Sequence, residues 1–152
     1  MDFQRDSIEA EEKLAALQQL ATNRFLWGNA LNAFQQTLKN MDDVRVVRLK
    51  TEQVYIQTED SRAKSADPKV PKVLLATEKI NITVDGLDSS PQPGGQINNF
   101  KSAIANEPFF LANLQRTNSV NLLSFSPPQA DTFGHSPFVK FSLQCFFPDK
   151  VR

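Results

Sequence analysis

The apolar positions of residues 17–41 recur at steps of three, four and seven residues. They are Leu17, Leu20, Trp27, Leu31, Phe34, Leu38 and Met41. Such heptad spacing places the side chains on one face of an α-helix. No proline interrupts residues 1–43. The pattern therefore predicts one long N-terminal helix, apolar on one face from about Leu14 and ending near Asn40.

Apolar runs and apolar–polar alternation after this helix predict β-strands. We expect strands at residues 44–49 and 53–58, joined by a turn at residues 50–52. A further strand is expected over residues 73–87, which hold the clearest alternation in the chain. Gly86 should end it.

The second half repeats the order of a helix followed by strands. Helical spacing predicts a helix over residues 96–106, which Pro108 interrupts or restarts. Strands are expected over residues 120–125 and 138–147. Within the first half, between the strands at residues 53–58 and 73–87, residues 59–72 are charged and hold two prolines, which predicts an exposed insertion.

A helix with one apolar face must pack that face against another layer. Two helices and four or five strands in αββ-αββ order suit a two-layer α+β sandwich, with both helices on one face of an antiparallel sheet. This order is a circular permutation of the ferredoxin-like βαββαβ plan. We therefore expect an N-terminal helical extension with coiled-coil potential at residues 1–22. A ferredoxin-like domain should follow at residues 23–148, with the insertion at about 59–72.

Composition narrows the class of protein. The chain has 152 residues, of which 40% are hydrophobic and 22% are charged, as in soluble globular domains. Its apolar runs are only a few residues long, whereas a transmembrane helix needs about 20 apolar residues. Lys and Arg number 17, and so do Asp and Glu. The chain therefore lacks the basic footprint of a nucleic-acid-binding domain, and we expect no nucleic-acid partner.

Residues that could carry out chemistry are few. Cys145 shares the apolar parity of the last predicted strand, so we expect a buried core residue rather than a nucleophile paired with His135. Asp131 and His135 alone are too few to hold a metal ion. Gly94 and Gly95 precede a helix, but the lysine of a phosphate-binding loop is missing. We therefore predict no catalytic, cofactor-binding or metal site, and a protein that is not an enzyme.

Several segments together resemble a known family. Residues 23–38 (NRFLWGNALNAFQQTL) combine an arginine, an aromatic residue and a Leu-Asn run, and the strand at residues 44–49 follows them. Residues 80–86 (INITVDG) form a strand that ends in glycine, and residues 97–100 (INNF) begin the second helix. Over residues 15–148 the pattern resembles the periplasmic domain of PilN-type type IV pilus inner-membrane assembly proteins, of the PilN/PilO family. PilO and the type II secretion L and M proteins share the fold and remain alternatives.

The resemblance implies a non-catalytic scaffold domain without a cofactor. It would lie at the periplasmic face of the bacterial inner membrane, held by an anchor outside this chain. It would act by homodimerisation or heterodimerisation, with PilO-like and PilM-like proteins as partners. Two alternatives stay open: a small ligand-binding or enzymatic domain on a ferredoxin-like scaffold, and a secreted, host-facing protein derived from pilus machinery.

The N-terminal helix supplies the predicted interface. We expect Trp27 to Leu38 to pack on the domain's own sheet, and the apolar face before them to extend beyond the core. Leu14, Leu17 and Leu20 are therefore the candidate contacts with another helix. The edges of an open antiparallel sheet are a second route to pairing.

Overall fold

The computed structural model describes residues 2–23, 25, 27–59, 74–130 and 136–151. In chain order its elements are α1 (Asp2–Asn23), α2 (Trp27–Leu38), β1 (Val44–Glu59), β2 (Leu74–Asp88), α3 (Gln96–Asn106), α4 (Pro108–Asn113), β3 (Val120–Phe125), β4 (Val139–Phe146) and β5 (Lys150–Val151).

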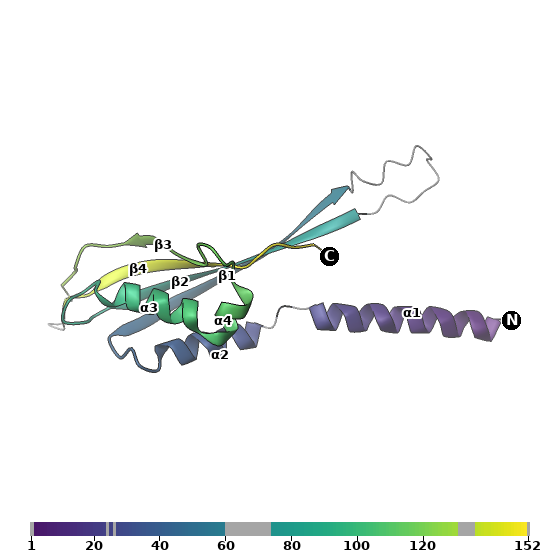
Figure 1. Ribbon diagram of the computed structural model, residues 1–152, viewed down its shortest axis with the longest axis horizontal. Coiled ribbons are helices and arrows are strands. Elements are labelled where there is room, and N and C mark those ends of the chain that lie inside the picture. Colours follow the sequence, from purple (N-terminus) through teal and green to yellow (C-terminus); the bar gives the residue numbers. More distant parts are fainter. Residues whose placement is uncertain (1, 24, 26, 60–73, 131–135, 152) are drawn as a thin grey trace.

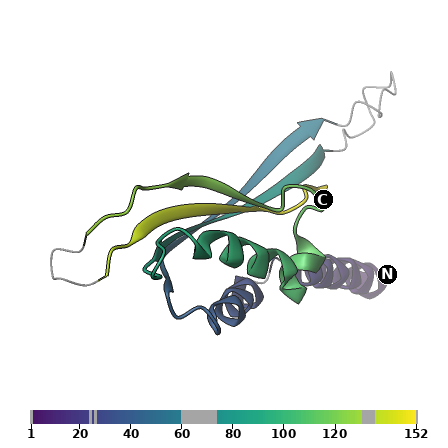
Figure 2. The ribbon, with the colours of Figure 1, turned by 60° about the vertical axis from the view of Figure 1, so that its left-hand side comes forward.

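The strands form one antiparallel sheet in the order β1-β2-β4-β3, and the short β5 pairs with β2. Helices α2, α3 and α4 all lie on one face of the sheet, whereas no helix in the described part of the chain covers the other face (Figures 1 and 2). Helix α1 stands apart from this two-layer body (Figure 1). The α+β class expected from the sequence is confirmed.

The core lies between the sheet and the three helices. Alternate residues of β2 and β4 point into it, because side chains along a strand face opposite sides of the sheet. The strands contribute Ile80, Ile82, Val84, Val139, Phe141, Leu143 and Cys145, and the helices contribute Phe34, Ile97, Phe100, Ile104 and Phe110. This alternation is the pattern that predicted the two strands.

The single long N-terminal helix was a wrong prediction, because the structure has two helices. Residue 25 lies between α1 and α2 in a non-helical conformation, and the side chain of Phe25 is buried. Its ring centroid lies 4.5 Å from that of Trp27 and 5.0 Å from that of Phe147, both in edge-to-face geometry. Phe25 is not on the heptad face. Anchoring it in the core interrupts the helix.

The buried face of α2 also differs from the predicted one. Its buried residues are Ala30, Ala33, Phe34 and Thr37. Leu31, predicted to pack on the sheet, is 54% exposed, whereas Trp27 and Leu38 are partly buried against the core. The small side chains of Ala30 and Ala33 let the helix approach its neighbours closely. A prediction from the spacing of large apolar residues does not include these alanines in the buried face.

Strand β1 is continuous, so the predicted turn at residues 50–52 was wrong. The strand pairs with β2 from Val44 opposite Asp88 to Glu59 opposite Leu74, with one bulge between Val46 and Arg48. The distal part of this hairpin projects beyond the helices (Figure 1). Strand β2 likewise runs past Gly86, where its end was predicted, to Asp88. Most of the predicted insertion, residues 60–72, lies outside the described residues.

The elements of the second half agree with the prediction. Helix α3 covers residues 96–106, and a new helix, α4, begins at Pro108. The side chain of Glu107 caps α4 by accepting hydrogen bonds from the backbone N–H groups of Phe109 and Phe110. Strands β3 and β4 occupy the predicted ranges. The sequence analysis missed β5, which lies in the charged tail.

Candidate functional site

The one cysteine of the chain lies in the core. Cys145 is fully buried in β4, and this burial raises the pKa of its thiol to about 12. The reactive thiolate is therefore essentially unpopulated at neutral pH. The burial predicted for Cys145 is confirmed. His135 and Asp131 lie outside the described residues, and the part of the chain that is described holds no group of three or more potential metal ligands.

The loop between β2 and α3 is organised by Asp88. Its buried carboxylate accepts hydrogen bonds from the backbone N–H groups of Ser90, Gly94 and Gln96, at 2.9, 2.8 and 3.0 Å. Burial by itself would raise the pKa of Asp88, but the Ser90 side chain and these backbone hydrogen bonds outweigh it and lower the pKa below the ordinary value. The N–H groups of Gly94 and Gln96, at the start of α3, are thus bound by the protein's own carboxylate.

The role of Asp88 was not predicted from the sequence. The signal was present, because an aspartate followed by Ser-Ser-Pro and two glycines is typical of a side chain that binds the backbone of its own turn. Gly94 has a φ of +94°, a backbone conformation that favours glycine and lets its N–H point at the carboxylate.

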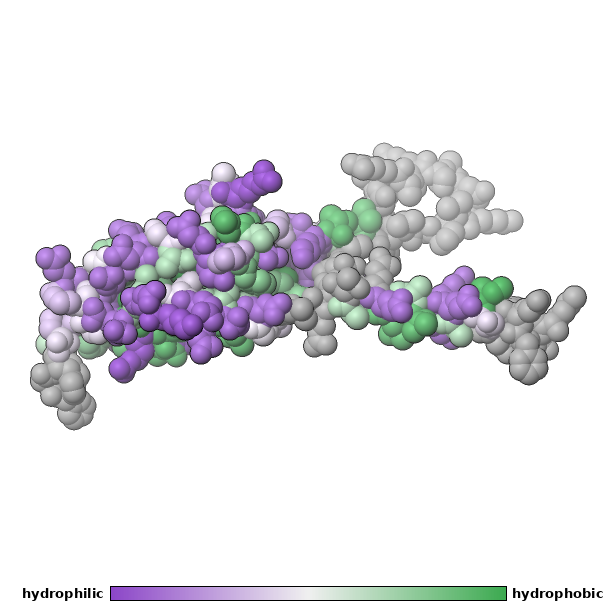
Figure 3. Space-filling model, turned by 60° about the horizontal axis from the view of Figure 1, so that its bottom comes forward, coloured by the Kyte–Doolittle hydropathy of each residue, from purple (hydrophilic) through white to green (hydrophobic). Residues whose placement is uncertain are grey.

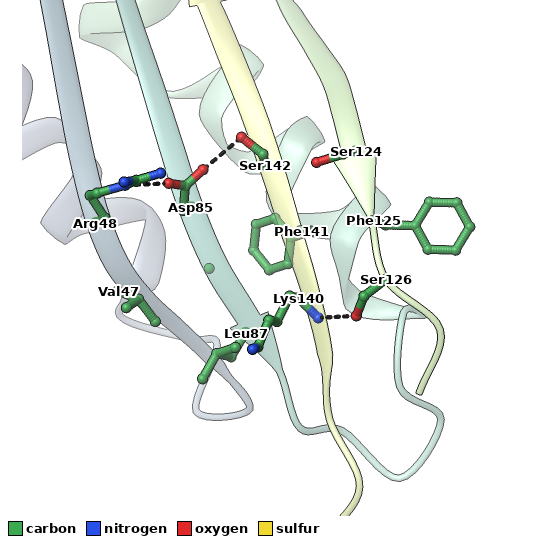
Figure 4. A pocket seen from close by; sticks show the side chains of 11 residues that line it. Val47, Arg48, Asp85, Leu87, Ser124, Phe125, Ser126, Lys140, Phe141 and Ser142 are labelled. Carbon is green, nitrogen blue, oxygen red and sulfur yellow. Dashed lines mark hydrogen bonds and ion pairs between the residues drawn. The ribbon is translucent and has the colours of Figure 1, made fainter. Parts of the chain in front are cut away.

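The uncovered face of the sheet carries a polar network across three strands. Asp85 on β2 accepts a hydrogen bond from Ser142 on β4 at 2.7 Å and an ion-paired hydrogen bond from Arg48 on β1 at 2.6 Å (Figure 4). The Ser142 hydrogen bond is the main cause that lowers the pKa of Asp85. Partial burial opposes it, and Arg48 adds to the lowering. Both carboxylate oxygens are therefore engaged.

A shallow depression of about 760 Å³ surrounds this network. Apolar groups of Val47 and Leu87 line it together with the polar side chains (Figure 4). Both oxygens of Asp85 are bound by neighbouring side chains, and the depression has a mixed polar and apolar lining.

Helix α1 exposes the residues that the sequence singled out. Leu14 and Leu17 are 57% and 62% exposed, while the side chain of Leu20 lies outside the described part of the helix. Apolar surface is visible along α1 where the helix stands clear of the domain (Figure 3). The structure thus places Leu14 and Leu17 on one accessible helix, away from the core.

The two edge strands also carry exposed apolar side chains. Large apolar side chains are exposed at Val47, Val54, Tyr55 and Ile56 on β1, and at Leu122, Leu123 and Phe125 on β3. Beside β1 lies a groove of about 220 Å³ between this strand and α2, lined by Trp27, Leu31, Leu49 and Thr51 among others. The sequence analysis expected pairing at a sheet edge but did not identify this groove, because it needs the position of α2 against β1.

Comparison of the chain with models of protein families, with curated proteins and with solved structures found no match. Within the described residues, none of the helices combines the length and the apolar character needed to cross a membrane.

Proposed function

We propose that this chain is a non-catalytic assembly domain that acts by pairing with a second copy or with a related domain. The observation that carries this proposal is α1. It is a 22-residue helix that stands clear of the domain with Leu14 and Leu17 exposed. Helices in proteins owe most of their stability to the packing of their apolar face. A partner helix would supply this packing.

We also propose that the domain has the permuted ferredoxin-like fold. Strands β2 and β3 each pair antiparallel with β4, so they run parallel to each other on either side of it. Helices α3 and α4 lie between β2 and β3 in the chain. The two strands and these helices therefore form a split βαβ unit, as in ferredoxin-like folds. If β4 is placed before α2, the order of elements becomes βαββαβ. The first and third strands of that order are β4 and β2, which are the two central strands of the sheet. This arrangement supports the assignment.

The partner class in this proposal comes from the sequence resemblance. On that basis the chain is a scaffold of a type IV pilus or type II secretion-like alignment complex at the periplasmic face of the inner membrane. PilO-like and PilM-like proteins are the partners to test. The proposal requires association and no chemistry, which agrees with the engaged carboxylates of Asp85 and Asp88.

The direct test is the molar mass of the full chain by light scattering, alone and mixed with the related domain of a PilO-like protein. We expect a dimer in at least one of the two samples. Leu14→Glu combined with Leu17→Glu should weaken this association at least about tenfold, because charge is placed on the apolar face that packs. The melting temperature should stay within a few degrees, since both side chains are exposed.

Ile8→Glu is the matched control. Ile8 is also exposed on α1, but it lies nine residues before Leu17 and thus about half a turn round the helix. It should leave association unchanged. A chain that is monomeric at high concentration and binds no related domain would remove the physical support for the assembly proposal.

A further inference from the structure

The outer edge of β1 is unpaired in the described structure. Strand β1 is 16 residues long and lies at one end of the sheet order, so only its inner edge pairs, with β2. The outer edge therefore presents a row of N–H and C=O groups that can pair with a further strand. A bulge between Val46 and Arg48 interrupts the strand near its start, so the regular part of this edge begins at Arg48.

The side chains on this edge alternate between two environments. Leu49, Thr51 and Gln53 lie opposite the buried Val84, Ile82 and Ile80 of β2, and therefore face the helices. Lys50 and Glu52 lie opposite Thr83 and Asn81, on the uncovered face, where they form an ion pair with each other at 2.5 Å.

Charge selects one way for two copies of this edge to pair. Identical antiparallel strands are related by a two-fold axis, which passes between the two copies of a single residue. An axis at Lys50 or at Glu52 sets like charges opposite each other, and an axis at Leu49 sets Arg48 opposite Lys50. An axis at Gln53 sets both charges opposite apolar residues. Among these registers, only an axis at Thr51 sets Lys50 of each copy opposite Glu52 of the other.

The same register brings apolar surface together. Thr51 lines the groove between β1 and α2, so an axis at Thr51 places the grooves of the two copies side by side. Leu31, which is 54% exposed at this groove, then faces the other copy. The two threonines form a cross-strand pair of a favourable kind. Pairing extends from Arg48, opposite Val54 of the other copy, to Val54, and it stops where the bulge begins.

We propose that the outer edge of β1 is a homodimer interface, in which two copies pair antiparallel about Thr51 and continue the sheet across both. The edge binds a second copy of this chain, because Lys50 and Glu52 make it complementary to itself. This inference rests on the assembly function proposed above and names one surface for it, distinct from α1.

The first test is cross-linking of the full chain carrying Thr51→Cys. Opposite Cα atoms in an antiparallel pair are about 4.5–5.5 Å apart, within the range for a disulfide. Cys145 is fully buried and should not interfere. Gln53→Cys is the matched control on the same face: its counterpart lies four residues along the partner strand, or about 13 Å away. We expect disulfide-linked dimer from Thr51→Cys at least about tenfold faster than from Gln53→Cys.

The second test changes the charges at positions 50 and 52 in the Thr51→Cys variant and measures the rate of cross-linking. Lys50→Glu alone and Glu52→Lys alone should each slow cross-linking by roughly tenfold or more, because two pairs of unlike charge per dimer become pairs of like charge. An equimolar mixture of the two variants should cross-link to each other again. In the mixed pair, a glutamate at position 50 faces a lysine at position 52, although neither chain has regained its own internal ion pair. Unchanged melting temperatures show that the variants are folded.

The outcomes separate this inference from the assembly proposal. If Thr51→Cys cross-links no faster than Gln53→Cys, or if the mixture is not rescued, the β1 interface is wrong, even when light scattering shows a dimer that depends on Leu14 and Leu17. If Lys50→Glu blocks a related domain while Thr51→Cys forms no homodimer, the edge binds a different partner and the second copy is excluded. If the chain also neither self-associates nor binds a related domain, both proposals fail.

Discussion

Gly86 shows how a single residue can be determined by its neighbour across the sheet. It lies within β2 opposite Phe141 of β4, whose ring covers it from the helix side. A Cβ atom at this position would lie 2.5 Å from the ring atom Cζ of Phe141. Phe141 is itself buried and packs edge-to-face on Phe100 at 5.9 Å. The ring has little freedom to move away, because interiors are closely packed.

We therefore expect Gly86→Ala to lower the free energy of unfolding by about 1–3 kcal/mol, the usual cost of overfilling a core. Gly28→Ala is the control, since a Cβ at Gly28 on the exposed side of α2 meets nothing within 4 Å. That change should leave stability unchanged or raise it slightly, because alanine favours the helix. Urea denaturation of both variants measures the difference. Equal behaviour of the two would show that the Phe141 ring yields freely.

Asp88 is the residue whose ionisation bears most directly on the fold. Its carboxylate binds three backbone N–H groups of the loop before α3, and its pKa is lowered in the folded state. A group whose pKa falls on folding stabilises the protein above its unfolded pKa, near 3.9 for Asp. This stabilisation is lost as the pH falls through the lower, folded value.

Asp88→Asn should accordingly lower the free energy of unfolding by about 2 kcal/mol at pH 7. The backbone N–H groups then bind a neutral acceptor more weakly than a carboxylate, and the NH₂ group of the asparagine cannot accept their hydrogen bonds. The difference from the wild type should shrink as the pH falls below about 4, because the carboxylate of the unfolded wild type then takes up a proton before that of the folded protein does. Urea denaturation at pH 7 and pH 3 tests this. A stability difference that stays constant over the two pH values would contradict the role given to the charge.

At the scale of elements, α1 and α2 have different roles. Helix α2 buries Ala30, Ala33, Phe34 and Thr37 in the domain core, whereas the described side chains of α1 are exposed. The buried ring of Phe25 separates the two helices. Helix α1 therefore contributes little to the stability of the isolated domain, and its apolar residues are available for pairing.

Removal of residues 1–23 tests this division. The melting temperature should change by no more than a few degrees, because the deletion leaves the buried core residues in place, including Phe25. Association that depends on α1 should be lost, as measured by light scattering at the same concentrations. A fall of more than about 10 °C would show that α1 packs on the domain and is not a free pairing element.

At the scale of the whole molecule, two separate surfaces are suited to association. One is α1, and the other is the outer edge of β1 with its groove against α2. If the same two copies use both, formation of the first contact makes the second effectively intramolecular and strengthens it. If different copies use them, the chain forms larger assemblies rather than a closed dimer. Light scattering of the wild type over a concentration series distinguishes these arrangements.

The sequence by itself determined the α+β class, the limits of α3, the restart of the helix at Pro108, the strands β3 and β4, and the burial of Cys145. These features depend on local periodicity and on turn residues, and both can be identified directly in the sequence. Apolar–polar alternation reports which face of a strand is buried, whatever its neighbours are.

Only the tertiary structure decided the remaining features, because each depends on residues far apart in the chain. The continuity of β1 through the polar Lys50-Thr51-Glu52 segment comes from its pairing with β2. The break after α1 comes from Phe25 packing against Phe147 near the other end of the chain. The buried face of α2 is set by its contact with α3 and α4. Local periodicity contains none of these contacts, since packing across the fold overrides local preference wherever the two differ.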